Sequence, residues 1–352
     1  MNDQASEANC GDQTRRDFLG RLVQTAVAGG VAASMLDAGA AALAAEIPPA
    51  EGRVRQRMLG RTGLKVSEIG LGGHSWSYAQ VPTAAGPLRK VNVEEAEGMI
   101  RAALEMGVNF LDSCTPLEES GTPGEALKRL KARDRFVLSM RVNHKMKGIK
   151  EDRQEIYDWA EQRLKLWQTD CMDLCLLCNT ESDTPDSGYW DMSWSIEALD
   201  KLKQQKKIRY TGFGCHFTPE QFLQAIDKFG DYFEICSLPY NIRHRAAETV
   251  LPAAKKKNMG IITIKPFARG SLLKGRDLQK ADAGLPRDMI AFVLGNPQVD
   301  ICTCGVHTLA QVKENLSASW TALTPERRQR LEMAAATPCP GYPWLEEGWH
   351  CA

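Results

Sequence analysis

One carboxylate stands at the end of a short apolar run, where an α/β protein could use it for chemistry. The run is Val108–Asp112, and loop-like sequence follows it. Helical patterns flank the run on both sides, so it predicts a buried strand between two helices. In α/β barrels the carboxyl ends of the strands form the active site. Asp112 is therefore the first candidate for a catalytic residue.

Cysteine and histidine residues also gather at or just after the carboxyl ends of predicted strands. Both residue types suit soft or borderline metals and clusters. The alternative is that apolar strands carry buried cysteines and that loops carry ordinary histidines. The pattern assigns no metal ligand, and a metal or iron–sulfur site stays an open hypothesis. The eight residues are Cys114, Cys178, Cys215, Cys304, His74, His144, His216 and His307.

The elements that must position these residues alternate between strand and helix patterns. Eight strand–helix units, with strands too apolar to face water on one side, predict a closed (β/α)8 TIM barrel in a single domain. A doubly wound open sheet is the alternative, but no G-x-G-x-x-G follows the first strand. Capping patterns at 92–95, 218–221 and 308–311 mark helix starts. The predicted strands are 66–71, 108–112, 136–140, 172–178, 208–213, 233–237, 261–265 and 299–304.

Residues 1–45 predict a cleaved twin-arginine signal peptide. The sequence at 14–19 is TRRDFL, a weakly apolar stretch follows, and Ala42-Leu43-Ala44 suits signal peptidase. The alternative, a membrane anchor, is opposed by Asp37, because a charge near the bilayer centre costs roughly 2.5–3.5 kcal/mol. We therefore expect a periplasmic or otherwise exported bacterial protein that uses the twin-arginine export machinery and keeps no stable membrane span. That route carries folded proteins, which hints at a cofactor loaded before export.

Charge and composition argue against a nucleic-acid partner. The chain has 44 basic and 44 acidic residues, and 43% of its 352 residues are hydrophobic. No overall field therefore attracts a polyanion. We expect the barrel to span 54–335, with a tail at 336–352 whose two cysteines, Cys339 and Cys351, form a disulfide or no covalent link.

Several blocks of the chain resemble the aldo-keto reductase family. They are 58–72, 103–112, 207–214, 240–241 and 311–315, and the likeness runs from about residue 54 to 320. Residues 213–216 and 265–270 resemble the branch of the family that often carries a C-terminal iron–sulfur extension. The two cysteines of the tail are fewer than such a cluster needs.

The resemblance implies a specific chemistry. The family moves hydride between NADPH and a carbonyl, using a Tyr as acid, a Lys paired to an Asp, and a His that holds the carbonyl. The Asp corresponds to Asp112, but Leu117, Arg141 and Cys178 stand in place of the Tyr, the Lys and the His, with Met140 at the Lys position if the strand slips. Leu117 donates no proton. Arg141 stays protonated and can pair bidentately with Asp112, while Cys178 is a weak donor or a thiolate.

Two readings of this altered set stay open. In one, Asp112 and Arg141 form a buried structural ion pair. In the other, they act near the nicotinamide, and the missing acid comes from Tyr78, His144 or Lys145.

The resemblance also implies an NADP(H) site. Ser237 stands in place of a Gln, Ile264 replaces a stacking aromatic residue, and His307 stands where a basic residue usually grips the 2′-phosphate. A helix N-terminus at the barrel edge suits a phosphate. The candidate cofactor residues are Ser237, Lys265, Arg269, Gly270, Gly305, His307, Gln311 and Asn315.

The sequence thus predicts an exported oxidoreductase that interconverts a small carbonyl and alcohol with NADP(H). One alternative is a non-catalytic binding protein on the same fold. The other is a metal or iron–sulfur redox protein that uses the cysteines and histidines at the strand ends.

Overall fold

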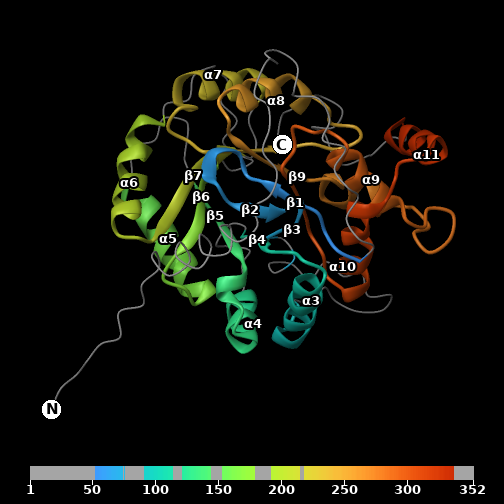
Figure 1. The fold of residues 1–352 in the computed structure, drawn as a ribbon, viewed down its shortest axis with the longest axis horizontal. Coiled ribbons are helices and arrows are strands. Elements are labelled where there is room, and N and C mark those ends of the chain that lie inside the picture. Colours follow the sequence, from blue (N-terminus) through green and yellow to red (C-terminus); the bar gives the residue numbers. More distant parts are fainter. Residues whose placement is uncertain are drawn as a thin grey trace, which may run out of the picture. The chain divides into compact units, whose positions relative to one another are not determined.

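The eight predicted parallel strands close into a barrel surrounded by helices (Figure 1). The computed structural model describes residues 52–73, 75, 91–113, 121–143, 153–178, 192–214 and 218–336, all within one compact unit, 48–352. The predicted (β/α)8 fold is confirmed. Around the barrel the strands are β3 (Ile69–Leu71), β4 (Phe110–Asp112), β5 (Val137–Asn143), β6 (Met172–Cys178), β7 (Ile208–Gly214), β8 (Ile235–Pro239), β9 (Gly260–Ile264) and β10 (Ile301–Cys304), with β10 pairing back to β3.

Helices follow the strands and cover the outside of the barrel. The capping boxes at Asn92 and Thr218 are both present, each satisfying two backbone N–H groups that the first helical turn leaves without partners. Among the described residues, no helix is long and apolar enough to cross a membrane. The helices are α3 (Val93–Glu105), α4 (Thr122–Leu130), α5 (Arg153–Trp167), α6 (Ser193–Gln204), α7 (Pro219–Phe229), α8 (Ala247–Lys256), α9 (Leu285–Leu294), α10 (Leu309–Leu316) and α11 (Pro325–Ala336).

The first predicted strand, 66–71, is wrong as a single element. Lys65–Ser67 forms β2, which pairs antiparallel with β1 (Gln56–Met58), and only Ile69–Leu71 enters the barrel. The chain changes direction at Glu68, whose buried carboxylate accepts hydrogen bonds from Arg57 (2.7 Å) and Ser319 (2.6 Å). The backbone of Glu68 joins the hairpin to the barrel, because its N–H donates to the Arg55 carbonyl oxygen and its carbonyl oxygen accepts from the Cys302 N–H. The hairpin crosses the centre of the ring of helices in Figure 1.

Side chains alternate along each strand between the barrel interior and the helices. Of three clusters of buried residues, one fills the interior and includes side chains from the hairpin, and the largest packs between strands and helices. Residues two positions beyond an interior residue face the interior again, one level nearer the carboxyl ends of the strands. The interior cluster is Leu59, Val66, Phe110, Leu174, Leu176, Ile235, Ile262 and Ile301.

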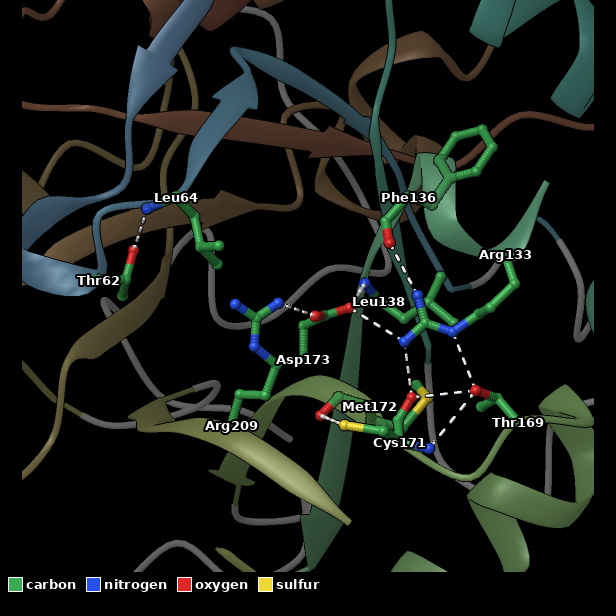
Figure 2. A network of polar contacts seen from close by, with 10 residues as sticks. All are labelled: Thr62, Leu64, Arg133, Phe136, Leu138, Thr169, Cys171, Met172, Asp173 and Arg209. Carbon is green, nitrogen blue, oxygen red and sulfur yellow. Dashed lines mark hydrogen bonds and ion pairs between the residues drawn. The ribbon is translucent and has the colours of Figure 1, made fainter. Parts of the chain in front are cut away.

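A polar network ties neighbouring strands together at their amino-terminal ends (Figure 2). Asp173, at the start of β6, accepts a hydrogen bond from the backbone N–H of Leu138 at 3.0 Å. Its carboxylate also pairs with Arg209 at 2.6 Å and Arg133 at 3.2 Å. Arg133 donates further to the carbonyl oxygens of Phe136 and Cys171. This end of a barrel supports stability rather than chemistry.

Replacing Asp173 with alanine should lower the free energy of unfolding by about 2–3 kcal/mol, because the buried N–H of Leu138 loses its acceptor. The Arg133 and Arg209 side chains are 28% and 44% exposed, so water can solvate them and the loss stays below the full cost of breaking a buried pair. Urea denaturation measures the change. Arg209→Ala is the control, with an expected loss of about 0–1 kcal/mol. Equal losses for the two variants would contradict this assignment.

Candidate functional site

An ion pair lies inside the barrel near the carboxyl ends of the strands. Phe110 on β4 belongs to the interior cluster, so Asp112, two residues later, faces the interior as well. On β5, Met140 packs outward against the helices and Arg141 faces inward. The Arg141 Nη2 atom lies 2.8 Å from Asp112 Oδ2, and both side chains are 6% exposed. The alternation therefore excludes Met140 from this position.

The pair makes one contact and not two. Asp112 Oδ1 is buried and has no hydrogen-bond partner in the described part of the chain. The prediction that the arginine could pair bidentately is therefore not realised. Instead, the Arg141 guanidinium reaches across the interior to β8, where Ser237 Oγ lies 3.3 Å from Nη1 and 3.4 Å from Nη2. One cation thus links three strands: β4, β5 and β8.

Cys178 is the last residue of β6, and its side chain also faces the barrel interior. Leu174 and Leu176 belong to the interior cluster, and Cys178 is the next residue in that alternation; it is 2% exposed. Its backbone pairs with Gly214 at the end of β7. A Cβ atom on Gly214 would lie 1.8 Å from the Ser237 carbonyl oxygen, so only glycine lets β7 approach β8 this closely. Asp112, Arg141, Cys178 and Ser237 therefore all face the barrel interior near the carboxyl ends of the strands, with Cys178 two residues further along β6 than Leu176, the residue that pairs with Arg141.

The candidate cofactor residues other than Ser237 lie at the ends of β9 and β10, which are neighbouring strands. Lys265 is half-buried, whereas Arg269, Gly270 and Gly305 are exposed. Ile264, the last residue of β9, pairs with Pro239 and is partly exposed.

Three more of these residues lie around α10: His307 just before it, Gln311 in its first turn and Asn315 near its end. The backbone N–H of His307 donates to Gln311 Oε1 at 2.7 Å, and the Thr308 side chain caps the helix by accepting from the Gln311 N–H. Asn315 differs from the rest, because it is buried and its amide donates to the Cys304 Sγ atom at 3.5 Å. Asn315 therefore lies beneath the surface, whereas Gly305 and Gln311 are exposed on it.

The loop after β9 has an unusual backbone. Lys265, Ala268, Arg269 and Gly270 have φ values of 59°, 47°, 57° and 89°. For the three residues that are not glycine this region is strained, and such strain is concentrated at ligand-binding loops. Asn241, which is fully buried, holds the loop by donating to the Lys265 carbonyl oxygen at 3.1 Å.

Sequence reasoning assigned no role to Asn241 or to His244. The Asn241 Oδ1 atom accepts from the backbone N–H groups of Arg243 and His244, an arrangement typical of an Asx turn. Burial, assisted by the nearby positive charge of Lys265, lowers the pKa of His244 to about 4. The Tyr240-Asn241 pair, three residues after the predicted strand 233–237 and directly after β8, was the available signal for this turn.

The described residues contain no group of three or more metal-binding side chains. Cys178 faces the interior, whereas Cys304 packs outward in the cluster beneath the helices. Burial raises the pKa of Cys304 to about 12, which keeps it a thiol and a poor metal ligand. Several predicted candidates lie outside the described residues: Leu117, Tyr78, Lys145, His74, His144, His216, Cys114, Cys215, Cys339, Cys351 and all of 1–45.

Comparisons with known proteins agree with the barrel fold. The sequence profile of the aldo/keto reductase family matches residues 68–289. L-galactose dehydrogenase of Arabidopsis thaliana is 25% identical over 295 residues, which cover 76% of this chain and 88% of that protein. YqkF, an uncharacterized oxidoreductase of Bacillus subtilis, is 22% identical over 319 residues, or 79% of this chain and 96% of that protein.

Solved structures show the same fold. The aldo-keto reductase AKR11C1 from Bacillus halodurans, in its holo form, matches with a TM-score of 0.60 at 24% identity, over 82% of this chain and 99% of that chain. The profile match covers more than half of the chain and includes β4 to β9, which carry Asp112, Arg141 and Ser237. This chain therefore belongs to the aldo/keto reductase family.

Proposed function

We propose that this protein is an exported oxidoreductase that interconverts a small carbonyl compound and its alcohol with NADP(H). The observation that carries the proposal is the Arg141 guanidinium, held inside the barrel between Asp112 and Ser237 near the carboxyl ends of the strands. A fixed cation at that level can stabilise negative charge on a substrate oxygen. Family membership and relatives named as oxidoreductases support the reaction class.

The loops after β9 and β10 fit a dinucleotide. Arg269 and Gly270 are exposed on the strained loop after β9. Gly305 and Gln311 are exposed after β10, the strand that pairs with β9. His307 precedes the capped start of α10, where backbone N–H groups and the helix dipole favour a phosphate. We assign the phosphates to this edge and the 2′-phosphate to His307. NADPH bound here would supply the hydride.

The residues of the chain act by holding and orienting the substrate. Arg141 keeps its proton at neutral pH, so it donates hydrogen bonds to a carbonyl oxygen without transferring a proton. Asp112 neutralises Arg141 and sets its direction, and Ser237 fixes its far side. Cys178 lines the barrel interior one step nearer the carboxyl ends of the strands than Arg141. In this arrangement Arg141 stabilises the negative charge that develops on the substrate oxygen, and the proton that completes the alcohol comes from another donor, for which Tyr78, His144 and Lys145 are the candidates in the sequence.

A non-catalytic binding protein is the second candidate. The observation that favours it is that the buried Asp112 pairs with an arginine, a cation that cannot act as a tunable acid. Purified protein that binds NADPH but oxidises none of it with a panel of small aldehydes and ketones would support this candidate. NADPH oxidation with any of them would support the oxidoreductase.

We also propose export through the twin-arginine route, with residues 1–45 as the signal. The pattern TRRDFL and the Ala42-Leu43-Ala44 site support this localisation. The N-terminus of the protein recovered from a bacterial periplasm should begin shortly after Ala44. Recovery of the full-length chain from the cytoplasm alone would refute this proposal.

His307→Ala should weaken NADPH binding about tenfold and leave NADH binding unchanged, because one charge-assisted hydrogen bond to the 2′-phosphate is lost. Fluorescence titration at pH 6.5 measures both dissociation constants. Lys313→Ala, which removes an exposed cation from α10, the helix that follows His307, is the matched control and should change neither dissociation constant. Equal weakening of both nucleotides would show that His307 does not contact the 2′-phosphate.

Asp112→Asn should lower the free energy of unfolding by about 3–5 kcal/mol, because Arg141 keeps a buried charge without its counterion. Turnover should fall at least tenfold as the guanidinium loses its orientation, while the Kd for NADPH stays within about twofold, since the phosphates lie on the β9–β10 side. Denaturation and steady-state assays separate these effects. Asp173→Asn is the control: it disturbs a buried carboxylate at the opposite end of the barrel and should reduce stability alone. Unchanged turnover in Asp112→Asn would mean that the pair is purely structural.

His244, which is buried in the turn after β8, should make the protein sensitive to acid. Its pKa is about 4 in the folded protein but near 6.5 in an unfolded chain, so protons bind the unfolded state first. The stabilisation is present above pH 6.5 and is lost as the pH falls towards 4, amounting to about 3 kcal/mol. His244→Gln should remove this part of the loss. Urea denaturation at pH 7, 5.5 and 4 tests it, and parallel curves for the two proteins would exclude His244 as the cause.

A further inference from the structure

Two buried oxygen atoms inside the barrel lack hydrogen-bond partners among the residues that the structure describes. They are Asp112 Oδ1 and Ser139 Oγ. Asp112 is 4% exposed and Ser139 is fully buried. Buried oxygens of this kind are nearly always satisfied, by protein or by ordered water, because burying them unpaired is costly.

The two residues are direct neighbours on the same face of the sheet. In the register of β4 and β5, Asp112 pairs with Ser139. Ser139 lies between Val137, which packs against the interior cluster, and the inward-facing Arg141, so its side chain faces the interior too. On its other side, Ser139 pairs with Leu174, an apolar residue of the interior cluster. Asp112 is therefore the polar neighbour that the sheet register offers to this hydroxyl.

The spacing suits a water molecule between the two oxygens. Neighbouring strands lie about 4.8 Å apart, and one water that makes two hydrogen bonds of about 2.8 Å spans roughly 4.5–5.5 Å. Phe110 and Val137 are the apolar residues on the amino-terminal side, Leu174 lies beside Ser139, and the contact between Asp112 and Arg141 lies on the other side. A polar position enclosed in this way, with two polar partners, is typical of a buried structural water.

We propose that a single water molecule binds between Asp112 Oδ1 and Ser139 Oγ, and that Ser139 thereby acts as a positioning residue for Arg141. The water donates to Oδ1 and leaves Oδ2 as the acceptor for Arg141. The arginine therefore pairs through one oxygen and keeps the rest of its guanidinium directed towards Ser237. Without the water, the carboxylate turns both oxygens to the arginine in the bidentate geometry that this pair of residues favours. The inference concerns geometry alone and goes beyond the proposed function, because it holds whether or not the protein transfers hydride.

Crystal structures of the whole protein and of Ser139→Ala, at about 1.5 Å resolution, test the proposal. In the wild type we expect a water within hydrogen-bond distance of both oxygens. In Ser139→Ala we expect that water to be lost, the Arg141 contact to become bidentate, and the Ser237 contact to lengthen. A direct hydrogen bond from Ser139 to Asp112 in the wild type, or an unchanged Arg141 in the variant, would overturn the proposal.

The sign of the stability change gives a second readout that needs no crystals. If the Ser139 hydroxyl has no partner, its removal raises Tm or leaves it unchanged, because an unsatisfied polar group disappears. With the bridging water, Ser139→Ala loses a hydrogen bond, and Tm should fall by about 2–4 °C. Thr303→Val is the matched control, since its buried hydroxyl donates directly to the Thr263 carbonyl oxygen. It should lower Tm similarly but leave the single contact between Arg141 and Asp112 in place. A raised or unchanged Tm for Ser139→Ala would refute the bridging water.

Discussion

The contact between Asp112 and Arg141 is the interaction on which the site depends. Both groups are charged and both are enclosed in the barrel, where a charge without a counterion is strongly disfavoured. Each residue therefore requires the other. Because Arg141 also reaches Ser237 on β8, the pair joins two sides of the barrel and fixes a cation at a defined level of the interior.

The barrel provides that level through the alternation of its strands. Apolar residues such as Phe110 and Ile235 fill the lower interior, and the residues two positions later, Asp112 and Ser237, bring polar groups to the next level. The second half of the site arises differently. Lys265 and the residues after it adopt a strained backbone that the Asn241 amide holds in place. Regular strands thus position the ion pair, whereas an irregular loop forms the candidate cofactor edge.

Features set by local periodicity were predictable from the sequence. The eight barrel strands, the capping boxes at Asn92 and Thr218, and the inward direction of Asp112 follow from alternation and short-range chemistry. Features set by distant contacts were not. The bend at Glu68 depends on Ser319, 251 residues later, and the contact of Arg141 with Ser237 spans 96 residues. The sequence shows that Glu68 and Arg141 can form hydrogen bonds, but only the folded barrel shows that Ser319 and Ser237 are their partners.

An arginine at residue 141 also changes what the neighbouring carboxylate can do. A lysine ammonium is a compact charge that can lose its proton when it is buried, so a Lys–Asp pair can tune a nearby acid. Arginine keeps its proton and spreads its charge over a planar fork, so it serves as a fixed donor to several partners. The geometry agrees with that role, because the guanidinium contacts Asp112 through one nitrogen and Ser237 through two. If the barrel catalyses a reaction, its contribution at this level is therefore charge stabilisation by a fixed cation, and any proton that the product needs comes from another donor.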